Sequence, residues 1–163
     1  MDGMLKMILG AVVGIVLAVA GLTYYGLSLM PAQNFEYDNA TETAQAEYLN
    51  SIGDFTVLMM KSKFKGDVAS VEGVNTDERQ VYLNLYLDAL MRGKKIPSEV
   101  VHSPEFASLV ERQFNIGIAQ NCRQEKMHKF FEQDLSLLIT LQMSGQTITD
   151  LELSKSACAE AIG

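Results

Sequence analysis

The sequence predicts a helix-rich α+β protein with one N-terminal transmembrane helix, followed by an exported domain of about four helices and a C-terminal β-hairpin stapled by a disulfide. Three observations predict it: a long apolar run, helical periodicities in the middle of the chain, and two cysteines on either side of alternating segments. The expected organisation is a cytoplasmic N-terminus over residues 1–6, a transmembrane helix over 7–30, a tether over 31–38 and one α+β domain over 39–163.

The segment from Met7 to Met30 contains no charged residue, histidine, asparagine or glutamine. A helix of this length spans the hydrocarbon layer of a membrane, which is about 30 Å thick. Lys6 precedes the segment, whereas Glu36 and Asp38 follow it. Because positive charge stays cytoplasmic, we expect a single-pass signal anchor in the bacterial inner membrane, with the C-terminal domain in the periplasm or outside.

Two further features of this segment bear on its role. The sequence Ala18-Val19-Ala20 matches a signal-peptidase site, so cleavage after Ala20 and release of the domain is the alternative to an anchor. Gly10 and Gly14 have the GxxxG spacing, which allows two membrane helices to approach closely and predicts a possible homo-oligomer. The simpler interpretation is that glycine is common in membrane helices.

Composition excludes some functions and indicates the redox state of the cysteines. The chain has 20 acidic and 13 basic residues and a net charge of −7, which argues against binding to nucleic acid. Its two cysteines, Cys122 and Cys158, lie in the part expected to be exported, and we expect a disulfide between them. The alternative is two buried free thiols.

The first helix of the domain is predicted after Asn39, because Asn39 and Glu42 have the spacing of a capping box. Its apolar residues recur at three and four, as on one face of a helix. Gly66 is placed to end it. The apolar residues proposed as a possible partner face are Tyr48, Leu49, Ile52, Phe55 and Met59.

The middle of the chain predicts a short strand or loop over 68–74 and then further helices. Polar residues Gln80, Asn84, Asp88 and Arg92 are spaced by four between apolar residues, which is typical of a helix that is buried on most sides. Ser103-Pro104 predicts the start of another helix that ends near Asn121, and residues 123–134 form a further amphipathic run.

The C-terminal part changes period. Residues 135–143 and 147–154 alternate between apolar and polar around the turn Ser144-Gly145-Gln146, which predicts a β-hairpin. A hairpin alone is marginally stable in water, so a third strand is expected, and the segment 68–74 could supply it.

No motif predicts catalysis. The two histidines are His102 and His128, and only Glu125, His128 and Glu132 share a helical face that could in principle bind a metal. A solvated charged face explains these three residues more simply. We therefore expect no catalytic residue, no cofactor and no metal.

The function that we expect is a non-enzymatic, membrane-anchored interaction or assembly subunit of a bacterial envelope complex. Its partners would be other membrane or envelope proteins. The alternatives are a free-standing periplasmic binder or inhibitor of the immunity type, released by cleavage after Ala20, and an enzyme of unrecognised type.

Overall fold

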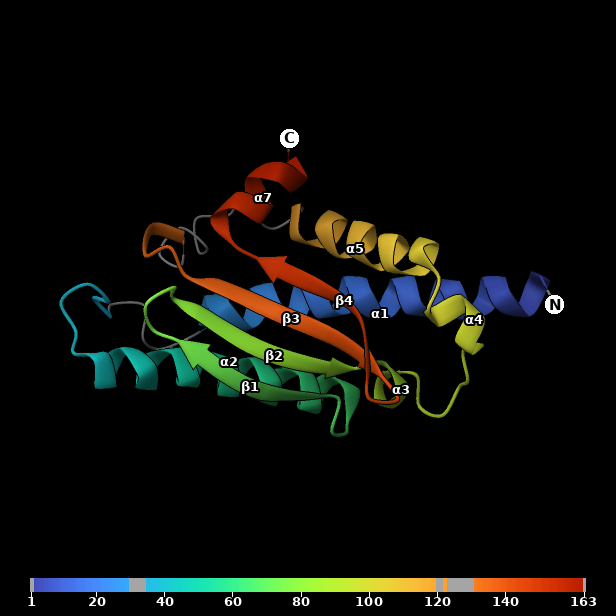
Figure 1. Ribbon diagram of the computed structural model, residues 1–163, viewed down its shortest axis with the longest axis horizontal. Coiled ribbons are helices and arrows are strands. Elements are labelled where there is room, and N and C mark those ends of the chain that lie inside the picture. Colours follow the sequence, from blue (N-terminus) through green and yellow to red (C-terminus); the bar gives the residue numbers. More distant parts are fainter. Residues whose placement is uncertain (1, 30–34, 120–121, 123–130, 163) are drawn as a thin grey trace.

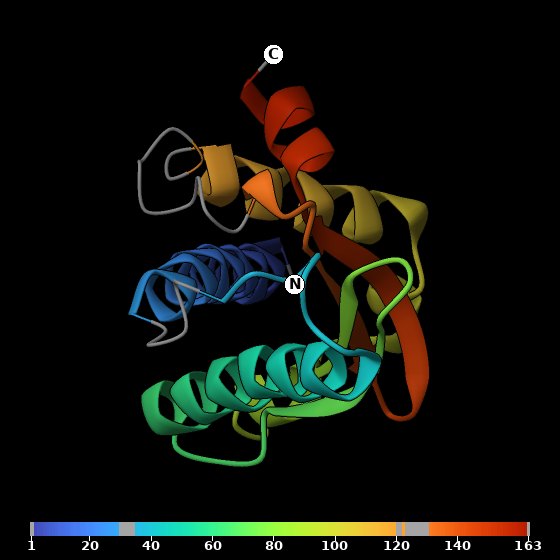
Figure 2. The same cartoon turned by 90° about the vertical axis from the view of Figure 1, so that its left-hand side faces the viewer.

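The architecture of the chain is taken from a computed structural model (Figure 1). The structure describes residues 2–29, 35–119, 122 and 131–162. At residues 2, 4, 5, 22–29, 161 and 162 it describes the backbone only. The described elements follow the order α1, α2, β1, β2, α3, α4, α5, β3, β4 and α7. They form one four-stranded sheet with its long helices on one side (Figures 1 and 2).

The sheet consists of two hairpins joined at its centre. Strands β1 (Ala69–Asn75) and β2 (Gln80–Tyr86) pair antiparallel, as do β3 (Ser136–Met143) and β4 (Gln146–Leu153). The two hairpins meet through β2 and β3, which run parallel, so the strand order is β1-β2-β3-β4. The parallel pair requires a long crossover, which the short helices and α5 supply.

Three long helices cover one face of the sheet. Helix α2 (Glu42–Phe64) packs on β1 and β2, and α5 (Pro104–Ala119) packs on β4. Helix α1 (Asp2–Leu29) lies between α2 and α5 and contacts both (Figure 2). The core is formed by the inward side chains of the strands together with these helices, and its largest fully buried members are Phe114, Leu49, Ile52, Met60, Leu83, Leu87, Ile118, Leu135, Leu137, Ile139 and Leu141.

The predicted transmembrane helix is wrong. Within the described part of the chain, no helix has the length and apolar character needed to cross a membrane. Four apolar residues of α1 are instead buried inside the fold, namely Val12, Val16, Val19 and Ala20, whereas Met7 is exposed. The hydrophobicity of these four residues is explained by burial in the fold, where α1 contacts α2 and α5. The single-pass inner-membrane location, which depended on that span, is corrected with it.

The predicted helix over the segment with polar residues spaced by four is also wrong. Residues 80–86 form strand β2, and only the four-residue helix α3 (Leu87–Leu90) follows. The reason is that a spacing of four also fits a strand, because four is a multiple of the two-residue strand period. Gln80 and Asn84 therefore lie on one face of β2, opposite the buried Val81, Leu83 and Leu85.

Two predicted helices are confirmed, with small differences at their ends. Helix α2 begins after Thr41, whose hydroxyl accepts a hydrogen bond from the N–H of Ala44, so Thr41 rather than Asn39 is the N-cap. It ends at Phe64, and the C-cap residue Lys65 takes the left-handed conformation expected of Gly66. Ser103 caps α5 as predicted, since its hydroxyl accepts from the N–H of Phe106 at 3.2 Å. The short helix α4 (Ser98–Val101) precedes α5.

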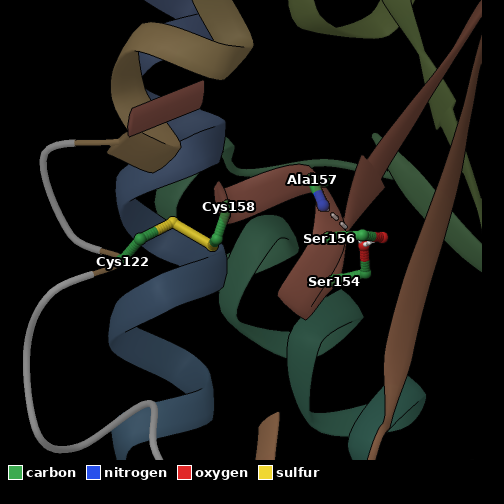
Figure 3. Close-up of a disulfide and its surroundings, with 5 residues drawn as sticks. All are labelled: Cys122, Ser154, Ser156, Ala157 and Cys158. Carbon is green, nitrogen blue, oxygen red and sulfur yellow. Dashed lines mark hydrogen bonds between the residues drawn. A yellow bond between two sulfur atoms is a disulfide. The ribbon is translucent and has the colours of Figure 1, made fainter. Parts of the chain in front are cut away.

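The C-terminal hairpin and the disulfide are confirmed, but the hairpin belongs to a larger sheet. Its turn residues Ser144 and Gly145 both have positive φ, as a tight two-residue hairpin turn requires. Cys122 and Cys158 are bonded (Figure 3). Cys158 lies in helix α7 (Lys155–Ile162), which the sequence analysis did not predict. The disulfide therefore joins α7 to the segment after α5. The predicted amphipathic run over 123–134 lies mostly outside the described residues.

Candidate functional site

The sheet has one face that the helices described by the structure leave uncovered. In β2 the odd-numbered residues point into the core, and in β3 the buried residues Leu137, Ile139 and Leu141 do the same. The alternate residues belong to the opposite face of the sheet, away from the helices. This is the face that is turned to the viewer in Figure 1. We call this surface the open face and define it by Ser70, Tyr82, Asn84, Tyr86, Leu138, Thr140, Gln142, Asp150 and Glu152.

Hydrogen bonds connect polar side chains of neighbouring strands on the open face. The strand registers place Ser70, Asn84, Thr140 and Asp150 side by side on the four strands. The hydroxyl of Thr140 donates to the carboxylate of Asp150 at 2.9 Å. The amide of Gln142 donates to the side-chain oxygen of Asn84 at 2.9 Å, across the parallel pair. These bonds hold the polar side chains in defined positions, so the open face is a preorganised surface.

The hydroxyls of two tyrosines are held by neighbouring polar side chains. The hydroxyl of Tyr86 lies 2.7 Å from that of Ser70 on the adjacent strand. The hydroxyl of Tyr82 donates to the side-chain oxygen of Gln80. Tyr82 and Leu138 are directly paired in register, which places an aromatic ring beside an aliphatic side chain near the middle of the sheet. Tyrosines with fixed rings and bonded hydroxyls are typical of protein-binding surfaces.

The charge of the sheet has one sign. The four strands contain only three charged residues, Glu72, Asp150 and Glu152, and no lysine or arginine. All three acids are exposed. Glu72 lies at the bulge in the edge strand β1, and the other two lie in the opposite edge strand β4. The neutral centre of the open face is therefore flanked by acidic residues on both edges.

One end of the sheet is closed by a cluster around Tyr37 and Arg79. The guanidinium of Arg79 lies 4.7 Å from the centre of the Tyr37 ring. It also donates a hydrogen bond to the carbonyl of Gln133 at 2.8 Å and forms a salt bridge with Asp38. The hydroxyl of Tyr37 donates to the carbonyl of Thr76. Burial raises the pKa of Tyr37, and the nearby positive charge of Arg79 opposes that rise. This cluster ties the segment before α2 to the β1–β2 turn, so its role is structural.

The residues predicted as a partner face do not form one continuous surface. Leu49 and Ile52 are fully buried in the core. Tyr48 is half-buried and stacks on Phe35 with 4.2 Å between ring centres. Phe55 and Met59 are also half-buried, whereas the neighbouring Leu58 is 62% exposed.

Gly10 and Gly14 are both exposed on α1. A Cβ atom built at either position would meet no other atom within 4 Å. Close packing of helices occurs instead on the inner side of α1, where a Cβ at Gly117 of α5 would lie 2.7 Å from the Cβ of Ala20. Association through Gly10 and Gly14 stays a prediction.

The predicted metal-binding face is only partly described. Glu125 and His128 lie outside the described residues. Among the residues that the structure describes, no three His, Cys, Asp or Glu side chains gather in a way that could hold a metal ion. His102 lines a surface hollow beside Lys94 and Lys95.

The open face was not predicted, because residues 80–86 were expected to form a helix and form strand β2 instead. The signal that identifies this strand is the alternation in QVYLNLY, in which Val81, Leu83 and Leu85 alternate with Gln80, Tyr82, Asn84 and Tyr86. Valine and tyrosine also favour strands over helices.

Comparison with known proteins reveals no relative of this chain. No protein-family model matches the chain, and no curated protein or solved structure resembles it significantly.

Proposed function

We propose that this protein is a non-enzymatic binding domain whose open face binds a basic segment of a partner protein. The observation that carries the proposal is the uncovered sheet surface, on which hydrogen-bonded polar and tyrosine side chains lie between two acidic edges. Binding surfaces are enriched in tyrosine and in adaptable polar groups such as asparagine and serine.

The charge distribution supports a basic partner. Glu72 on one edge and Asp150 and Glu152 on the other are exposed, and no lysine or arginine lies in the strands between them. Lysine and arginine side chains that extend from a bound segment can reach either edge, while its apolar side chains contact Tyr82 and Leu138. Such complementarity favours basic partners over acidic ones and speeds association.

The experiment uses the full chain, isotope-labelled for NMR, and two synthetic peptides of equal length. One peptide alternates lysine with leucine, and the other alternates glutamate with leucine. The basic peptide is expected to shift the amide signals of β2, β3 and β4, and the acidic peptide is expected to leave them unchanged. Equal binding of both peptides, or shifts confined to the helices, would contradict the proposal.

A pair of double variants provides the matched control. Glu72→Lys with Glu152→Lys reverses the charge of the β1 edge and cancels that of the β4 edge, where Asp150 remains. This double variant is expected to weaken binding of the basic peptide roughly tenfold. Glu42→Lys with Glu47→Lys makes the same charge change at exposed positions of α2 and is expected to have little effect. If both double variants weaken binding equally, the open face is not the binding site.

A further inference from the structure

A second candidate site lies outside the open face, in a hollow of about 580 Å³ on the surface. It is bounded by the loop after α3, by α4 and by the β3–β4 turn. Ligand sites commonly have volumes of about 300–1,000 Å³, so the hollow is large enough for a small organic molecule.

The rim of the hollow is cationic although the protein is acidic. Lys94 and Lys95 line it, together with His102, and all three are exposed. Among the described residues of the lining, the one acid is Asp88, whose carboxylate accepts a hydrogen bond from the N–H of Ser144 at 3.1 Å. The charge of Asp88 is therefore partly compensated by the turn that it holds, and two ammonium groups remain for a ligand.

The inner part of the hollow is apolar. Ile96 and Val101 are 4% and 3% exposed, and Met143 from the end of β3 is half-buried beside them. A methionine side chain adapts its shape readily to a bound apolar group. The hollow thus combines a positively charged rim with an apolar interior.

The backbone holds the two lysines at the rim. Arg92 and Gly93 both have positive φ, with values of 52° and 81°, and reverse the chain directly before Lys94. The N–H of Lys94 donates to the carbonyl of Met91 at 3.1 Å, which closes this turn. The position of the rim is therefore set by local hydrogen bonding and does not depend on a ligand.

We infer that this hollow binds a small organic anion, a carboxylate carried on an apolar chain. The ammonium groups of Lys94 and Lys95 face the carboxylate, and the chain lies against Met143 and the buried residues below it. A free inorganic anion uses the rim alone and leaves the apolar interior in contact with water, so it binds more weakly than an amphipathic anion.

The test titrates the full chain with octanoate and follows the amide signals of residues 88–102 and 143–146 by NMR. Matched probes are octan-1-ol, octylamine, butanoate and inorganic phosphate. Octanoate is expected to bind most tightly, with butanoate and phosphate at least several-fold weaker. Equal binding of octylamine, or of phosphate, would overturn the inference.

Variants separate the two parts of the site. Lys94→Gln with Lys95→Gln is expected to weaken octanoate binding roughly tenfold, whereas Lys63→Gln with Lys155→Gln removes the same charge elsewhere and is expected to leave it unchanged. Met143→Ser is expected to reduce the advantage of octanoate over butanoate. Unchanged binding in the first double variant, measured on protein with a wild-type circular dichroism spectrum, would refute the inference.

Discussion

The close contact between α1 and α5 can be tested by adding a single methyl group. In Gly117→Ala the new Cβ would lie 2.7 Å from the Cβ of Ala20. Two carbon atoms normally lie about 3.5–4.0 Å apart, so the helices must separate by roughly 1 Å. Overpacking of this kind costs about 1–3 kcal/mol, and the better helix propensity of alanine offsets about 1 kcal/mol of it.

We therefore expect Gly117→Ala to lower the free energy of unfolding by about 1 kcal/mol. Gly14→Ala is the matched control, because the new methyl group at that position meets no atom within 4 Å. It keeps only the gain in helix propensity and is expected to stabilise the protein by up to about 1 kcal/mol. The assay is urea unfolding of the oxidised protein, followed by circular dichroism.

A rescue variant distinguishes this contact from a general effect of the substitution. Ala20→Gly combined with Gly117→Ala moves the methyl group from one helix to the other and restores the spacing. A double-mutant cycle over the two positions is expected to show a favourable coupling of about 1–2 kcal/mol. If Gly117→Ala and Gly14→Ala change stability by the same amount, and the cycle shows no coupling, then α1 does not pack on α5 as described.

Three further predictions concern the disulfide, the cluster at the end of the sheet and the response to alkaline pH. Replacing Cys122 and Cys158 by alanine opens a loop with a sequence separation of 36 and is expected to cost about 3–4 kcal/mol in urea unfolding, with faster amide exchange in α7 than in the sheet. Arg79→Met removes two side-chain contacts and the interaction with the Tyr37 ring and should lower the unfolding free energy by about 1–3 kcal/mol, whereas the same change at the exposed Arg112 should have little effect. Burial raises the pKa of Tyr48 above its ordinary value of 10, although a hydrogen bond to Gln133 opposes the rise. The unfolded chain therefore loses this proton first and stability should fall as pH rises past about 10, less steeply in Tyr48→Phe; equal slopes in both proteins would contradict this.

The sequence predicted those elements whose signals are local. Ser103 and Pro104 identify the start of α5, and the turn Ser144-Gly145 identifies the hairpin, because capping and turn geometry depend on neighbouring residues. The disulfide was predicted from the even number of cysteines and is confirmed. These features need no knowledge of distant contacts.

The features that sequence reasoning missed depend on contacts between distant segments. Val12 and Val16 have the same hydrophobicity whether they face lipid or another helix, so the sequence of α1 does not reveal that they are buried in the fold. Asn84 lies on the open face because β2 pairs with β3, a partner much later in the chain. The hollow beside Lys94 likewise forms only when the β3–β4 turn comes next to the loop after α3.

The parallel pairing of β2 with β3, called the seam below, affects the order in which the sheet can fold. Each outer hairpin is built from neighbouring residues and can form early, whereas Gln80 and Ser136 meet only after the whole segment between them has been arranged. The bond from Gln142 to Asn84 crosses this seam. We therefore expect the open face to be completed late in folding. A partner that contacts both halves of it is then expected to bind folded molecules and not partly folded ones.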